Sequence, residues 1–135
     1  MNYSCLGREN KTDKSPKIAI KGANCCASGP FHTVISTDEN KIYSWGYNIN
    51  CSTLGINGAE VRKNAQTGNY ARVGQLGREL NKNLCPPGEV PLTVDSDVID
   101  IRCGAAFSMI LTSKGTIYSW GYNGENCVIF LTLYI

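Results

Sequence analysis

The chain has 135 residues, of which 42% are hydrophobic and 18% are charged, and its net charge is +2. This length suits one modest domain, and the composition is that of a folded globular protein, which excludes wholesale disorder and a coiled coil. The small net charge excludes a general electrostatic attraction to nucleic acid or to an acidic membrane, so the sequence carries no direct nucleic-acid signal.

The cysteines and the first residues bear on metal binding and on location. Seven cysteines form no C-x-x-C pair and His32 is the only imidazole, so the spacing of a zinc site is absent. The start Met-Asn-Tyr-Ser lacks the basic region and apolar run of a signal peptide, which predicts a cytoplasmic or nuclear location. In that reducing setting we expect the cysteines to be small buried side chains rather than disulfide partners.

Residues 1–22 are the most basic part of the chain. Only two acids, Glu9 and Asp13, lie among five basic side chains, which are Arg8, Lys11, Lys14, Lys17 and Lys21. We favour a solvated loop over an anion-binding patch, because the charges follow no helical or strand period.

The first predicted element is a β-hairpin over residues 32–45. Two β-leaning stretches, 32–38 and 41–45, flank the pair Glu39-Asn40. Asn tolerates the positive φ of a tight hairpin turn, so we expect these two residues to form a two-residue turn. Such a turn places Thr37 opposite Ile42, Ser36 opposite Tyr43 and Val34 opposite Trp45. Val34, Tyr43 and Trp45 then share one face, and Ile35, Thr37, Ile42 and Ser44 share the other.

A long polar segment follows. Residues 49–73 contain three glycines and no helical or alternating apolar period, which indicates a surface loop. A loop of this length is usually functional or disordered in a compact domain, and a decayed duplication is the alternative.

The next predicted element repeats the first one. The heptapeptide IYSWGYN occurs at residues 42–48 and again at 117–123, and ten of the twenty positions from 29 to 48 are identical 75 residues later. A second hairpin is therefore expected over residues 107–120, with Lys114-Gly115 as its turn. Its predicted pairs are Thr112 with Ile117, Leu111 with Tyr118 and Met109 with Trp120.

Both faces of each hairpin carry apolar bulk. Short hairpins that are buried on both sides and recur at long intervals favour stacked radial blades over a sandwich with one solvated face. Gly46 and Gly121, which follow the tryptophans, are expected where the backbone bends or approaches another segment closely.

The order of these motifs resembles the regulator of chromosome condensation repeat family. In that family G-x-x-H-T-x-A-L-T is followed by a turn, V-Y-S-W-G-x-N and G-Q-L-G. The first copy here has Gly29, His32, Thr33 and Thr37 before IYSWGYN, and then Gly74-Gln75-Leu76-Gly77, Pro91 and Val94. The second copy has Gly104, Ser108, Thr112 and Gly115 before the same heptapeptide.

The resemblance implies an all-β fold, a seven-bladed β-propeller of which this chain supplies about two blades of four-stranded antiparallel sheet with a loop insertion at 49–73. Residues 1–126 follow the family order: 1–23 match the end of a preceding repeat, 24–98 form one repeat, and 99–126 begin the next. Residues 127–135 form an apolar tail where another G-Q-L-G is due. We interpret this tail as the product of truncation, a shifted frame or an unspliced intron, and it is far shorter than the roughly 20 residues of a membrane helix.

We expect no catalytic, cofactor-binding or metal-binding residue and no enzyme activity. The position of His32 is taken by Phe107 in the second copy, so a packed, hydrogen-bonded histidine is favoured over a catalytic one. The pair Cys25-Cys26 has no neighbouring base, and the glycine-bearing turns lack the lysine and hydroxyl of a phosphate-binding loop. The repeated tryptophans are expected to pack between blades rather than to stack on a ligand.

Three functions remain open at this point. The resemblance implies a protein-binding module, and its name-giving member implies the alternative of a guanine nucleotide exchange factor for a Ran-type small GTPase at chromatin. A third interpretation is an inactive gene fragment of a larger multidomain protein. The expected partner is a protein, with a small GTPase or a chromatin protein as candidates. Two isolated blades would leave apolar faces and strand edges uncovered, so we expect the chain to aggregate, self-associate or remain partly disordered.

Overall fold

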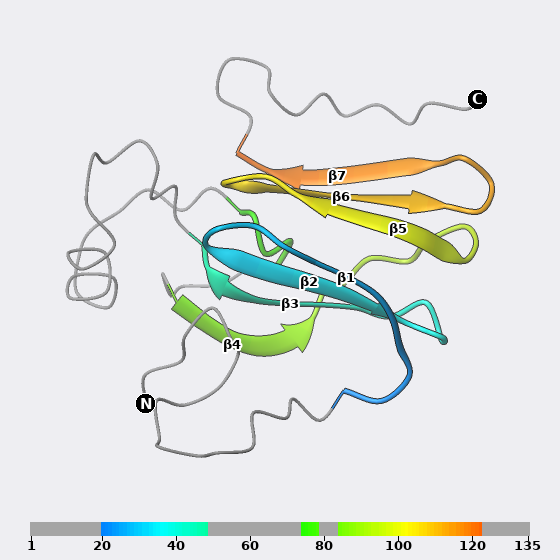
Figure 1. Ribbon diagram of the computed structural model, residues 1–135, viewed down its shortest axis with the longest axis horizontal. Coiled ribbons are helices and arrows are strands. Elements are labelled where there is room, and N and C mark those ends of the chain that lie inside the picture. Colours follow the sequence, from blue (N-terminus) through cyan, green and yellow to red (C-terminus); the bar gives the residue numbers. More distant parts are fainter. Residues whose placement is uncertain (1–19, 49–73, 79–83, 123–135) are drawn as a thin grey trace.

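The computed structural model describes residues 20–48, 74–78 and 84–122, which form two antiparallel sheets and no helix (Figure 1). The first sheet has the order β1-β2-β3-β4 and the second has the order β5-β6-β7. The strands are β1 (Ala23–Ser28), β2 (His32–Thr37), β3 (Ile42–Tyr47), β4 (Leu84–Glu89), β5 (Val98–Cys103), β6 (Phe107–Thr112) and β7 (Ile117–Gly121). The all-β class and both predicted hairpins, β2-β3 and β6-β7, are confirmed.

The hairpin turns have three residues rather than the two that we predicted. Thr37 pairs with Lys41 through its backbone N–H, and the Asn40 N–H also donates to the Thr37 carbonyl at 2.9 Å. Asn40 has a φ of 58°, and Gly115 has a φ of 83° at the same place in the second hairpin. This is a turn closed by a residue in the left-handed region, so the need for positive φ was predicted correctly and the loop length was not.

The extra turn residue shifts the register by one position. Ser36 lies opposite Ile42, Ile35 opposite Tyr43 and Thr33 opposite Trp45. Leu111 likewise lies opposite Ile117, and Ser108 opposite Trp120. Because side chains alternate with a period of two, the predicted faces were wrong. Val34 shares a face with Ser44 and Ile42, whereas Tyr43 and Trp45 share the opposite face with Ile35.

The core lies between the two sheets, with β1 and β2 next to β5 (Figure 1). Val34 and Ile42 from the first sheet pack with Ile101 and Ile110 from the second, and Val90 and Val98 complete this buried cluster. Its members are between 0% and 4% exposed. Apolar burial between the sheets therefore makes the two sheets one packed unit.

Strand β4 was not located from the sequence. Its residues are Leu-Cys-Pro-Pro-Gly-Glu, a composition that is unfavourable for a strand. It pairs only with β3 and forms the edge of its sheet, where proline is tolerated because the missing N–H need not pair. In the second sheet, the described residues provide three strands.

Several predictions concern residues outside the described part of the chain. These are the basic N-terminal segment as far as Ala19, the loop insertion at 49–73 and the apolar tail at 127–135. The repeat boundaries at 1–23, 24–98 and 99–126 stay predictions.

Candidate interaction surface

A short turn, residues 74–77, ties the two sheets together. The N–H of Gly77 donates to the carbonyl of Gly74 at 2.9 Å, which closes the turn around the fully buried Gln75 and Leu76. From the first sheet, the Ser44 hydroxyl donates to the Leu76 carbonyl at 2.6 Å. From the second, the Ser108 hydroxyl and Trp120 Nε1 both donate to the Gln75 carbonyl at 2.9 Å. The G-Q-L-G motif thus supplies backbone acceptors between the sheets.

His32 completes this buried polar seam. It is 0% exposed, and its Nε2 lies 2.8 Å from the Ser108 hydroxyl oxygen. Because that hydroxyl donates its proton to Gln75, the Nε2 atom of His32 must be the donor to Ser108. Burial lowers the pKa of His32 from 6.5 to about 4, against a smaller raising effect of a backbone hydrogen bond with Phe107. The prediction of a packed, hydrogen-bonded histidine is confirmed.

The tryptophans and the glycines after them have packing roles. A side chain on Gly77 would meet Trp120 Nε1 at 2.8 Å, so the indole lies directly against the 74–77 turn. Trp45 is 5% exposed. Gly121 has a φ of 116°, and a Cβ there would meet the Ala106 carbonyl oxygen at 2.5 Å. The predicted close backbone approach at this glycine is confirmed, and Gly46 has the same geometry.

The described cysteines form no disulfide and lie in different environments. Cys85 is buried, and Cys25 and Cys103 are partly buried against the core. Cys26 is exposed on β1, so the expectation of a buried thiol was wrong at this position. Burial raises the pKa of the Cys103 thiol, which keeps it protonated and unreactive.

An open hollow of about 320 Å³ lies beside the β2-β3 turn. Its lining includes two lysines and two acids, Lys21, Lys41, Asp38 and Glu39, together with Tyr43. The mixed charges favour neither an anion nor a cation. In the described ranges, no three His, Cys, Asp or Glu side chains gather as a metal site would require. Among the described residues there is no helix that is long and apolar enough to cross a membrane.

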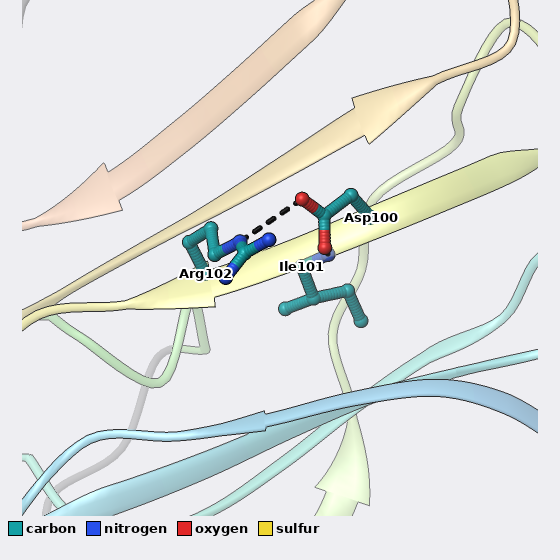
Figure 2. Close-up of polar contacts among 3 residues, drawn as sticks. All are labelled: Asp100, Ile101 and Arg102. Atoms are coloured by element: carbon teal, nitrogen blue, oxygen red, sulfur yellow. Dashed lines mark hydrogen bonds and ion pairs between the residues drawn. The ribbon is translucent and has the colours of Figure 1, made fainter.

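The side of the β5-β6-β7 sheet that faces away from the first sheet is called the outer face here. Its side chains are Asp100, Arg102, Phe107, Met109, Leu111 and Ile117, which alternate with the core residues along each strand. The four apolar members are partly exposed. Figure 2 shows Asp100 and Arg102 on the side of β5 opposite to Ile101, joined by an ion pair of 2.9 Å between Arg102 Nε and Asp100 Oδ2. An apolar patch is thus bordered by an ion pair whose two charges cancel.

Comparison with known proteins decides the origin of the repeat. The family model described as the regulator of chromosome condensation (RCC1) repeat matches residues 27–51 and 98–127. The chain is built from repeats of the regulator of chromosome condensation type. The first RCC1 match covers the β2-β3 hairpin of the first sheet, and the second match covers β5, β6 and β7 of the second sheet.

The proteins that this chain resembles are much longer than the chain itself. The E3 ubiquitin-protein ligase HERC2 of Mus musculus is 30% identical over 132 residues, which cover 93% of this chain and 2% of that protein. The crystal structure of Kap60 bound to yeast RCC1 (Prp20) matches with a TM-score of 0.58 and 23% identity, over 87% of this chain and 23% of that one. The crystal structure of Prp20p from Saccharomyces cerevisiae matches with a TM-score of 0.51 and 24% identity, over 76% and 19%. These likenesses establish the fold, a partial RCC1-type propeller, and the chain spans only a small part of each relative.

Sequence reasoning missed two features of this region. Arg78 donates to the backbone carbonyls of Ser44 and Pro86 at 3.0 and 2.8 Å and so joins β3 to β4. Asp95 accepts hydrogen bonds from the hydroxyls of Thr112 and Thr116 and holds the β6-β7 turn. No sequence motif predicts the hydrogen bonds of Asp95. The position of Arg78, directly after G-Q-L-G, is a feature from which its contacts could have been predicted.

Proposed function

We propose that this chain is a protein-interaction module made of two RCC1-type blades, which acts by binding rather than by catalysis. The observation that carries the proposal is the outer face, where Phe107, Met109, Leu111 and Ile117 form an apolar patch beside the Asp100–Arg102 pair. An apolar centre with a charged border is the usual composition of a protein-binding surface. The hydroxyls of Ser44 and Ser108, the Trp120 N–H and His32 Nε2 form hydrogen bonds within the seam, which supports a packing role for it.

The neighbours support a protein as the partner. Prp20p is described with binding properties to Gsp1p and histones, and the yeast RCC1 structure is a complex with Kap60. These interactions belong to those proteins, of which this chain corresponds to about a fifth. By analogy, we propose a protein partner of the small GTPase or chromatin class and a location in the cytoplasm or nucleus.

Binding of the immobilised chain to Gsp1p, histones and Kap60, measured by biolayer interferometry, tests the proposal. We expect binding to at least one of these proteins. Leu111→Asp should weaken it by about tenfold or more, because it places a charge in the apolar centre of the surface. Thr93→Glu, an exposed change in the connection between β4 and β5, is the matched control and should leave binding unchanged. Absence of binding to all three proteins contradicts this proposal.

Guanine nucleotide exchange is the second candidate, favoured by the Gsp1p binding named for Prp20p. Release of a fluorescent nucleotide from Gsp1p separates the two functions. We expect the chain to leave the release rate unchanged even where it binds, because it spans only 19% of the Prp20p chain. An accelerated release would establish exchange activity and replace the binding-only proposal.

A further inference from the structure

We draw no further inference here: the strongest candidate, the partly exposed apolar patch on the outer face of the β5-β6-β7 sheet, belongs to the surface already assigned to partner binding, its packing against another sheet restates an established property of RCC1-type repeats, and nothing in the described residues shows what else covers it.

Discussion

At the scale of single residues, His32 shows how one repeat position serves two environments. The first copy uses an imidazole that bonds Ser108 at 2.8 Å, and the second copy uses Phe107 at the equivalent place on the partly exposed outer face. A buried imidazole is tolerated here because its Nε2 proton has an acceptor and the ring is neutral. Protonation would place an uncompensated charge between the sheets.

The lowered pKa of His32 makes stability depend on pH in a defined direction. The unfolded histidine binds a proton near pH 6.5, whereas the folded one does so only near pH 4. Between these values the unfolded state holds more protons, so the free energy of unfolding falls as pH falls from 6.5 to 4. At about 1.4 kcal/mol per pKa unit, the loss is on the order of 3 kcal/mol.

Urea unfolding of the His32→Phe variant, measured between these pH values, should show that most of the pH dependence is removed. Ser108→Ala deletes the same hydrogen bond but keeps the imidazole, and it should retain the dependence; equal pH profiles for the two variants would contradict the assignment.

At the scale of elements, the hairpins show what a sequence reveals about a turn and what it leaves open. Asn40 and Gly115 indicate positive φ at one position, because these residue types tolerate it. They do not reveal whether one or two residues precede that position in the turn. Backbone hydrogen bonds decide this, and a shift of one residue places Val34 and Trp45 on opposite faces, where the two-residue turn had predicted one shared face. The motif order predicted the family and the fold correctly. It did not predict β4, because this strand lies in a Pro-Pro-Gly segment with no strand pattern.

The β2-β3 turn has a second function that its equivalent lacks. Asn40 Nδ2 donates to Asp97 Oδ1 at 2.9 Å, and the Val98 N–H donates to Asn40 Oδ1 at 3.2 Å, so this turn attaches to the start of β5. Asn40→Gly keeps the positive φ and removes both contacts, while Asn40→Ala removes the contacts and adds backbone strain. We expect the free energy of unfolding of Asn40→Ala, measured by chemical denaturation, to be about 1 kcal/mol lower than that of Asn40→Gly. At Gly115, which has no such side chain, Gly115→Asn should be tolerated better than Gly115→Ala. If alanine and glycine are equivalent at position 40, the left-handed conformation is not what the turn requires.

At the scale of the whole molecule, the two sheets share a single core and the 74–77 turn. Ile101 and Ile110 come from the second sheet, yet they pack on Val34 and Ile42 of the first. Ser44 and Ser108, one from each sheet, donate to adjacent carbonyls of the same turn. The sequence predicted two similar units, but not that the G-Q-L-G segment of the first unit would provide acceptors for the second. That contact depends on how the units are placed, which local patterns do not encode.

Because the two sheets share this core, we expect a core substitution to reduce protection from hydrogen exchange in both sheets together. Ile110→Ala removes a side chain that is 1% exposed and leaves a cavity between the sheets, at a cost of about 2 to 5 kcal/mol. Hydrogen exchange should therefore accelerate in β2 and β3 as well as in β5 and β6, because opening exposes one cooperative unit. Ile99→Ala is the matched control on β5, since Ile99 is 55% exposed, and it should change exchange little in either sheet. Faster exchange confined to β5, β6 and β7 after Ile110→Ala would mean that the blades open independently and that the seam does not couple them.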